Sequence, residues 1–272
     1  LGDALRAAAE RSADSAVGGA PLVISTKVGR LLRADAPADP SSIFRGVPQV
    51  NPVFDFSADG VRRSLEESLV RLGRDRIDIV YLHDPDDHFE QALGEALPVL
   101  RQWRAEGVVG AIGAGMNQSA MLTRFVTDGD IDCVLLAGRY TLLDQTALED
   151  LLPACLAMDV AVVIGGVFNS GVLANPLPGA PYDYIPAPDD VLARASRLAA
   201  VCTTFNVPLR AAALQFPLAH PAVACVLAGA RSAGEIDDSA KMLDIKIPAA
   251  LWEALRAEGL LSASAPCPSD PR

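Results

Sequence analysis

The sequence predicts an α/β protein built around a parallel β-sheet, and three observations predict it. Short apolar runs alternate with helical patterns six times along the 272 residues, half of the residues are hydrophobic, and the links between the runs are mostly short. The six runs are apolar enough to be buried on both faces, as parallel strands usually are. The predicted strands are Leu22–Thr26, Ile77–Leu82, Val108–Gly113, Cys133–Ala137, Ala161–Gly165 and Val223–Ala228.

The helices between these strands show one apolar face each. In 59–72, Val61, Leu65, Leu69 and Leu72 share a face, and 90–106 repeats the pattern with leucines and Trp103. Helices are also expected over Ala233 to Met242 and after Pro248.

Two segments read as long loops, Leu31 to Phe56 and 175–188, and both follow predicted strands. We expect one domain over 1–261 and a loose tail over 262–272.

Six strands fit either an open doubly wound sheet or part of an eight-stranded barrel. Every predicted strand is followed by polar or glycine-rich residues suited to a ligand. An open sheet concentrates its ligand at one switch point, whereas a barrel uses all of its strand-to-helix loops, so the loops favour a (β/α)8 TIM barrel.

Composition limits the classes of function. A net charge of -11 and a pI near 4.7 argue against non-specific nucleic-acid binding. The longest apolar run, Val160 to Phe168, is too short to span a bilayer, so we expect a cytoplasmic protein that is a monomer or a weak homo-oligomer and has no membrane partner. Five widely spaced cysteines without a Cys-x-x-Cys pair predict mostly buried, reduced thiols.

Lys27 and His83 each close a predicted strand, which places them where α/β enzymes carry their chemistry. Lys27 could form a Schiff base, lower the pKa of a neighbour, or be an ordinary exposed lysine. His83 could be catalytic or structural. His88 and His220 read as structural, and the acidic residues 84–87 read as a solvated turn, because they lack the spacing of a metal-binding loop. No metal site is predicted.

The glycines at 110, 113 and 115 have the wrong order for a dinucleotide loop, and no acidic strand end follows them. Leu227 to Ser232 is more informative, because a strand, a small-residue loop and a helix N-terminus together form an anion site. Its residues are Gly229, Ala230, Arg231 and Ser232.

At these residues the sequence resembles the aldo-keto reductases, and most closely the sugar-oxidising branch with L-fucose dehydrogenases and pyridoxal 4-dehydrogenases. The matches run in family order along nearly the whole chain. They are Ser25–Arg30, Ser64–Gly73, Asp78–His83, Val108–Gly113, Arg139–Asp144, Gly165–Gly171 and Gly229–Ser232.

The resemblance implies a (β/α)8 barrel that binds a nicotinamide dinucleotide without a Rossmann domain. Lys27 matches the lysine whose charge lowers the pKa of a catalytic tyrosine, and His83 matches the histidine that orients the substrate oxygen. The family's catalytic Asp and Tyr have no counterparts here, and the sequence starts at Leu1 in an amphipathic helix. We therefore expect a truncated copy that lacks the first two barrel strands, about 50 to 60 residues, and that is itself inactive without the missing Asp and Tyr.

The resemblance also implies a cofactor site. Many relatives have Ser-Asn after the third strand and Gln after the fourth, where this sequence has Gly115–Asn117 and Leu136–Gly138, and Asn117 is the candidate carboxamide contact. A stacking aromatic of many relatives is replaced around Gly165-Gly166. Asn169 and Ser170 follow the fifth strand, and Asp238 and Ser239 match the adenine contacts. An acidic Glu235 would repel a 2′-phosphate, which predicts NAD, although Arg231 leaves NADP possible.

The resemblance implies hydride transfer from C1 of an aldose such as L-fucose, giving a lactone, with oxidation of pyridoxal as the alternative. The substrate would be a small polar aldose or a pyridoxal-like molecule, selected by Arg45, Asn51, Tyr182 and Tyr184 on the two long loops. A non-catalytic nucleotide-binding barrel, an inert fragment and a Schiff-base aldolase acting through Lys27 are the competing hypotheses.

Overall fold

The computed structural model describes residues 22–37 and 50–269. Its residues form two compact units. Unit 1 comprises Leu1–Met116 and Asp128–Cys133, and unit 2 comprises Asn117–Thr127 and Val134–Arg272.

Unit 1 is built on three parallel strands in the order β1-β4-β5. The ladder begins where the Asp78 carboxylate accepts the Ile24 backbone N–H (2.8 Å) and Ile24 O accepts two N–H groups of β4. The elements of unit 1 are β1 (Ser25–Val28), β2 (Arg30–Arg33), β3 (Asn51–Phe54), α2 (Ala58–Leu72), β4 (Ile77–His83), η1 (Asp86–His88), α3 (Phe89–Gln91), the π-helical turn η2 (Ala92–Ala96), α4 (Leu97–Glu106) and β5 (Val109–Met116).

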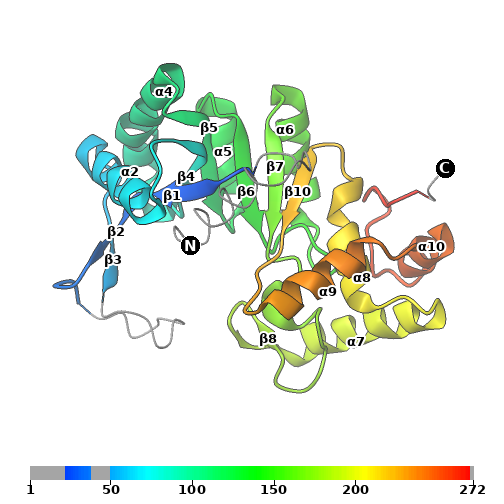
Figure 1. Cartoon of the computed structure of the whole chain (residues 1–272). Coiled ribbons are helices and arrows are strands. Elements are labelled where there is room, and N and C mark those ends of the chain that lie inside the picture. The colour runs from blue at the N-terminus through cyan, green and yellow to red at the C-terminus, as the bar shows by residue number, and fades with distance from the viewer. Residues whose placement is uncertain (1–21, 38–49, 270–272) are drawn as a thin grey trace, which may run out of the picture. The chain divides into compact units, whose positions relative to one another are not determined.

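Helices α2 and α4 pack beside these strands (Figure 1). Helix α2 begins where Ser57 Oγ accepts the Gly60 N–H, and it ends at Gly73, whose φ of 65° is left-handed. Val61 and Leu65 of its apolar face are fully buried, as the sequence pattern predicts. The predicted helix 90–106 is a succession of α3, η2 and α4, because a π-helical turn interrupts its hydrogen-bond pattern.

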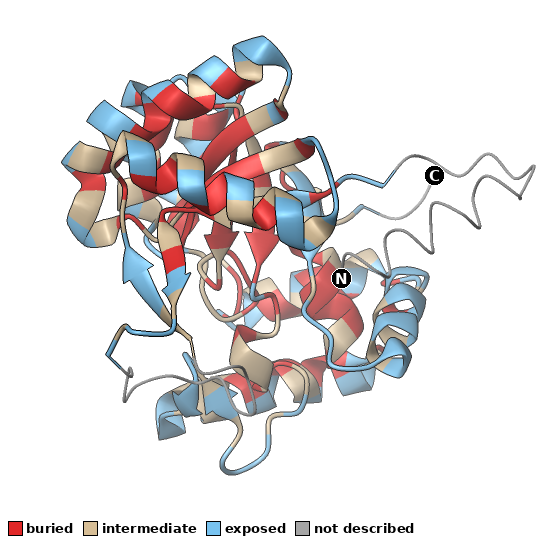
Figure 2. Cartoon of the chain, turned by 60° about the vertical axis from the view of Figure 1, so that its left-hand side comes forward, coloured by how far each residue is buried: buried red, intermediate tan, exposed pale blue. Residues whose placement is uncertain are grey.

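Unit 2 holds three strands in the order β6-β7-β10, and β7 and β10 pair in parallel. Most residues of β6 and β7 are buried, and the others are half-buried (Figure 2). Its elements are α5 (Ser119–Asp128), β6 (Cys133–Ala137), η3 (Thr146–Leu148), α6 (Leu151–Met158), β7 (Ala161–Gly165), η4 (Asn169–Gly171), β8 (Pro181–Tyr182), β9 (Ile185–Pro186), α7 (Asp189–Thr204), α8 (Leu209–Gln215), η5 (Pro217–Ala219), β10 (Val223–Leu227), α9 (Ala233–Leu243) and α10 (Ala249–Ala257).

All six predicted strands are present, but the burial prediction is wrong at two of them. β1 begins at Ser25, and Leu22 and Val23 before it are 65% and 70% exposed, because pairing with β4 starts only at Ile24 and Ser25. In β10, Ala224, Cys225 and Leu227 are exposed. This strand pairs with β7 alone among the described strands, so it lies at the edge of the unit 2 sheet.

The two predicted loops contain short antiparallel pairs, which corrects that prediction. β2 pairs with β3 in the first segment, and β8 pairs with β9 in the second. Each pair carries a proline, Pro52 or Pro181, and prolines favour the edges of sheets and mask strands in a sequence pattern.

The segment after residue 261 makes several contacts with the rest of unit 2. Arg256 donates to Ala265 O (2.7 Å), and the Ser262 N–H donates to Gln145 Oε1 (2.9 Å). Leu260 and Ala265 are fully buried. The single domain predicted over 1–261 stays a prediction.

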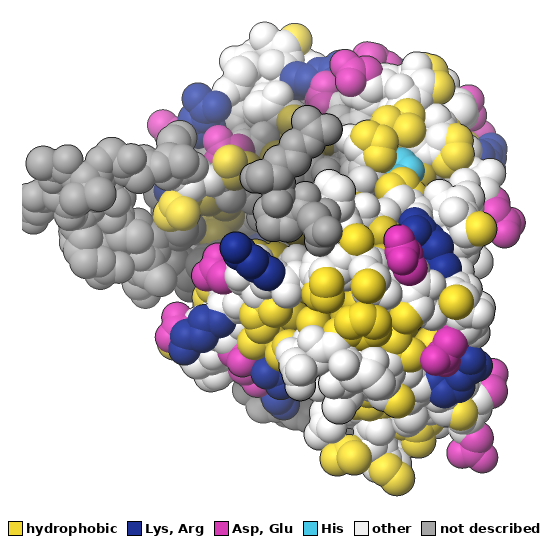
Figure 3. All heavy atoms as spheres, turned by 90° about the vertical axis from the view of Figure 1, so that its right-hand side faces the viewer, with side chains coloured by type: hydrophobic (Ala, Val, Ile, Leu, Met, Phe, Trp, Pro, Cys, Tyr) yellow, Lys and Arg dark blue, Asp and Glu magenta, His cyan; other side chains and the backbone are white. Residues whose placement is uncertain are grey.

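The surface carries mixed charges. On the face in Figure 3, basic side chains stand beside acidic ones around a group of hydrophobic side chains. No helix in the described part of the chain is long and apolar enough to cross a membrane. Within the described ranges no three His, Cys, Asp or Glu residues gather as metal ligands. None of the five cysteines, all of which lie within the described residues, forms a disulfide. Cys225 is exposed, which corrects the expected burial.

Candidate active site

Lys27 and His83 lie on neighbouring parallel strands of unit 1. Lys27 of β1 stands opposite Tyr81 of β4, and His83 ends β4 two residues later. Because parallel strands end at the same edge of a sheet, both residues lie toward one carboxyl edge. Both are half-buried. The structure therefore brings together the two residues that the sequence predicts as catalytic.

Burial and positive charge hold His83 neutral. Burial is the main cause that lowers its pKa to about 3, and the charges of Lys27 and Arg30 add to it. Burial also lowers the pKa of Lys27, while the nearby Asp84 carboxylate opposes this shift. The pair thus offers one cation and one neutral imidazole.

Arg30 and Asp84 complete this cluster, and the sequence reasoning did not assign them. Arg30 Nη2 forms an ion pair with Asp84 Oδ2, which also lies 3.6 Å from His83 Nε2. Asp84 adopts a left-handed φ of 44° directly after β4. The prediction of a solvated turn is therefore wrong for Asp84. The two residues are 54 positions apart, so no local pattern signals their contact.

The carboxyl ends of β6, β7 and β10 in unit 2 also lie at one edge of the sheet. The Gly138 N–H donates to Gly165 O (2.9 Å), which joins the end of β6 to the end of β7. In the ladder, Leu227 of β10 stands opposite Gly165. The loops after these strands, with Asn169-Ser170 in one and Gly229–Ser232 in another, therefore start at one edge.

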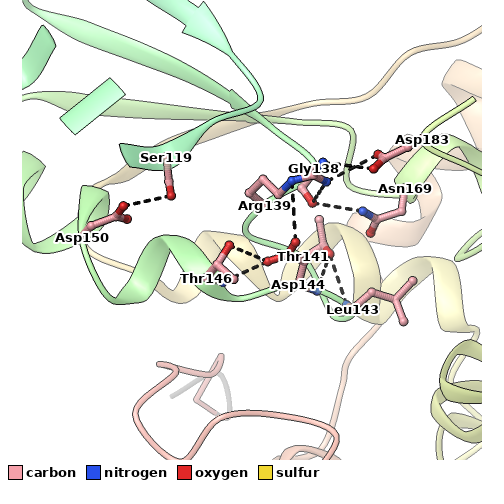
Figure 4. Close-up of polar contacts among 10 residues, drawn as sticks. All are labelled: Ser119, Gly138, Arg139, Thr141, Leu143, Asp144, Thr146, Asp150, Asn169 and Asp183. Atoms are coloured by element: carbon pink, nitrogen blue, oxygen red, sulfur yellow. Dashed lines mark hydrogen bonds and ion pairs between the residues drawn. The ribbon is translucent and has the colours of Figure 1, made fainter. Parts of the chain in front are cut away.

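Asn169 and Ser170 are held in an uncommon backbone conformation. Their φ angles are 44° and 60°, and Asn169 is 2% exposed. Asn169 Nδ2 donates to Gly138 O (3.1 Å), as Figure 4 shows. Asn169 Oδ1 is buried and has no hydrogen-bond partner within the described residues. Strained backbone of this kind clusters at ligand sites.

An arginine links the end of β6 to the β8–β9 pair (Figure 4). Arg139 Nη2 lies 3.0 Å from Asp183 Oδ2, and its Nε lies 3.8 Å from Asp144 Oδ2. Asp144 is fixed in turn by the Thr146 hydroxyl, which donates to Asp144 Oδ1 at 2.7 Å. The Tyr184 N–H donates to Ser170 Oγ (3.2 Å), so the pair β8–β9 also contacts the Asn169–Ser170 loop.

The predicted anion loop is exposed and leads into α9. Ser232 caps α9 by accepting the Glu235 N–H (3.3 Å), and Gly229 to Ser232 are all exposed. Glu235 accepts the Arg231 backbone N–H (2.7 Å) and its guanidinium (3.0 Å). Both hydrogen bonds lower the pKa of Glu235, and the bond from the Arg231 backbone has the larger effect. The first-turn N–H groups of Ala233 and Gly234 have no acceptor within the helix and suit a phosphate.

The remaining predicted residues are placed as follows. Asp238 pairs with Arg210 (3.0 Å), and Ser239 is half-buried on the same helix, α9. Asn117 is exposed after β5, and Asn51 donates to Ala36 O (2.9 Å). Burial raises the pKa of Tyr182, and Tyr184 is 66% exposed. Arg45 lies outside the described residues.

The two histidines predicted to be structural pack against aromatic rings. His88 stacks on Phe54 with ring centroids 5.5 Å apart, and His220 meets Tyr140 edge-on at 5.7 Å. His220 Nδ1 also accepts the Ala222 N–H (3.2 Å).

The fold is that of an α/β protein with polar and charged side chains at the carboxyl ends of its parallel strands. The family model for the aldo/keto reductases matches residues 1–258, and the chain belongs to this oxidoreductase family, whose fold is the (β/α)8 barrel. The sequence-based identification of the family and the fold class is thereby confirmed.

Two relatives and two solved structures illustrate the similarity. A D-threo-aldose 1-dehydrogenase from a Pseudomonas species is 43% identical over 247 residues, covering 88% of this chain and 75% of the relative. A pyridoxal 4-dehydrogenase from Microbacterium luteolum is 41% identical over a 283-residue alignment, covering 96% and 80%.

The structures are similar in fold. An aldo-keto reductase from Bacillus halodurans, in its holo form, superimposes with a TM-score of 0.67 at 24% identity, covering 90% of this chain and 74% of that one. A glycerol dehydrogenase from Gluconobacter oxydans gives a TM-score of 0.64 at 18% identity, covering 92% and 75%.

Proposed function

We propose that this protein is an NAD-dependent dehydrogenase that oxidises C1 of an aldose such as L-fucose to a lactone. The observation that carries the proposal is that Lys27 and a neutral His83 lie on neighbouring parallel strands, toward the same carboxyl edge. The 43% identical aldose dehydrogenase supports the choice of substrate class.

Each residue has a separate task in this reaction. NAD, when bound, accepts the hydride. The neutral His83 ring can donate a hydrogen bond to the reacting oxygen without adding charge. Lys27 holds a positive charge near that oxygen and would favour passage of its proton to a base, a task that the family resemblance gives to a tyrosine with no counterpart in this sequence. The partly buried setting strengthens this charge effect relative to water.

The cofactor would be held by unit 2. The loops with Asn169-Ser170 and Gly229–Ser232 leave adjacent strands, and the first turn of α9 offers N–H groups to a phosphate. Arg231 is 92% exposed and already paired with Glu235, whose charge disfavours a 2′-phosphate. These contacts support NAD over NADP.

The test is NADH formation by the purified product of the complete coding sequence, with L-fucose and with pyridoxal at equal concentration, repeated with NADP. We expect turnover of L-fucose with NAD, and a fall of about 100-fold or more in Lys27→Met. The matched control is Lys246→Met, which changes a lysine near the end of α9. Faster turnover of pyridoxal would support the second candidate, which the 41% identical relative favours. NAD binding without turnover of either substrate would instead support a non-catalytic nucleotide-binding protein.

A further inference from the structure

Asp84 lies next to His83 at the end of a strand, where its carboxylate can reach a bound ligand as well as fix the loop. It follows His83 directly, at the carboxyl end of β4, and its N–H donates to Gly115 O of β5 (3.0 Å). Its side chain is 35% exposed and that of His83 is 29% exposed. A small molecule that contacts His83 therefore has room to contact the Asp84 carboxylate.

The two oxygens of this carboxylate have different surroundings. Oδ2 pairs with Arg30 and lies 3.6 Å from His83 Nε2. Oδ1 accepts no hydrogen bond from any residue that the structure describes. An ionised carboxylate accepts several hydrogen bonds, so Oδ1 retains its capacity to accept one from a ligand hydroxyl.

The antiparallel pair β2–β3 positions Arg30. Arg30 and Phe54 are cross-strand partners, and the Arg30 guanidinium lies over the Phe54 ring at 4.6 Å. Phe54 stacks in turn on His88. Burial raises the pKa of Asp84, whereas the charges of Arg30 and Lys27 oppose this shift. The guanidinium, fixed between the Phe54 ring and the carboxylate, orients Asp84.

We propose that Asp84 is a specificity residue whose Oδ1 accepts a hydrogen bond from the hydroxyl next to the reacting carbon, with Arg30 as its positioning residue. The inference rests on the proposed function, in which His83 contacts the reacting oxygen. When the C1 oxygen of an aldose contacts His83, the C2 hydroxyl lies beside it and can donate a hydrogen bond to the Asp84 carboxylate.

The decisive comparison uses two substrates and two variants. L-Fucose and 2-deoxy-L-fucose are assayed with the unchanged chain, with Asp84→Asn and with Asp87→Asn. Asn has the shape of Asp and is one of the few residues that tolerate the left-handed φ. Asp87 is an exposed acid in the same turn, so it provides the matched control.

We expect Asp84→Asn to lower kcat/KM for L-fucose about 10- to 100-fold, and to change the value for the 2-deoxy sugar less than threefold. Asp87→Asn should leave both unchanged. Because the ratio of the two substrates is taken within one protein sample, partial unfolding of a variant cancels.

An equal fall for both substrates, or no fall for L-fucose, overturns the inference and leaves Asp84 as a structural anchor. Calorimetric affinities of the two sugars give the same ratio without turnover. Absence of turnover in the unchanged chain therefore counts against the proposed function alone, while the affinity ratio still decides the role of Asp84.

Discussion

His83 keeps its neutral form to low pH, and this has a consequence for stability. An unfolded histidine titrates near 6.5, whereas the pKa of His83 falls to about 3 in the folded chain, mainly through burial. Between these values the unfolded state binds one proton more than the folded state. Stability from this group is therefore complete above pH 6.5 and is lost as the pH falls toward 3.

Replacing His83 should weaken this acid sensitivity. We expect the melting temperature of His83→Gln to fall less between pH 6.5 and pH 4 than that of the unchanged chain. The variant has no imidazole at this position to take up a proton on unfolding. Thermal melts across this range measure it, with His88→Gln as the control that keeps His83. Parallel curves for His83→Gln and the unchanged chain would contradict the assignment.

Gly29 allows the turn between β1 and β2. Its φ is 95°, and a Cβ there would lie 2.2 Å from a ring atom of Phe56. Gly29→Ala should therefore lower the free energy of unfolding by about 2–4 kcal/mol, from backbone strain and overpacking together. Gly107→Ala is the control, because Gly107 has a φ of 74° and no atom within 4 Å of its would-be Cβ. Urea unfolding of both variants measures the difference, and equal losses would exclude the steric part.

At the scale of elements, the β8–β9 pair has a strained turn. Its central residues, Asp183 and Tyr184, both have positive φ angles, 47° and 68°. This is the pattern of a type I′ turn, which normally contains Asn and Gly. The Arg139–Asp183 ion pair and the Tyr184–Ser170 hydrogen bond offset the strain from outside the turn.

Removing the ion pair should loosen the turn without unfolding the protein. Asp183→Asn should speed hydrogen exchange of the Tyr184 amide about 1.5- to 5-fold, since an exposed ion pair contributes about 0.2–1 kcal/mol. Asp190→Asn, at the start of α7, is the control. Exchange that stays unchanged in Asp183→Asn would show that the Ser170 contact alone holds the turn.

At the scale of the whole molecule, the proposed cofactor loops belong to unit 2. A ligand that binds only the folded state slows exchange most where it binds. We expect saturating NAD to slow the amides of 166–172 and 229–236 more than those of β1 and β2, as measured by hydrogen-exchange mass spectrometry. Equal slowing in both sets would contradict this assignment.

The sequence predicts best what depends on local pattern. β6 and β7 have the predicted bounds, because their apolar runs end at Gly or polar residues. Lys27 and His83 are predicted because each follows an apolar run, and their catalytic roles stay predictions. β2 and β3 are missed, since a four-residue edge strand with a proline has no clear alternation.

What depends on distant pairing cannot be read from the pattern. The Arg30–Asp84 contact joins residues 54 positions apart, and the Arg139–Asp183 contact joins residues 44 apart. The exposure of β10 likewise follows from its place in the sheet and not from its composition, which is that of a buried strand.

The exposed Cys225 gives this chain a built-in labelling position. Cys133, Cys155 and Cys202 are buried, so a maleimide dye reaches Cys225 first, with the half-buried Cys267 as the slower competitor. Burial raises the pKa of the Cys225 thiol, so labelling needs mildly alkaline buffer. A dye at Cys225 would sit four residues before Gly229, close enough to sense a nucleotide arriving at that loop, and a Cys267→Ser background would make the fluorescence signal come from one site.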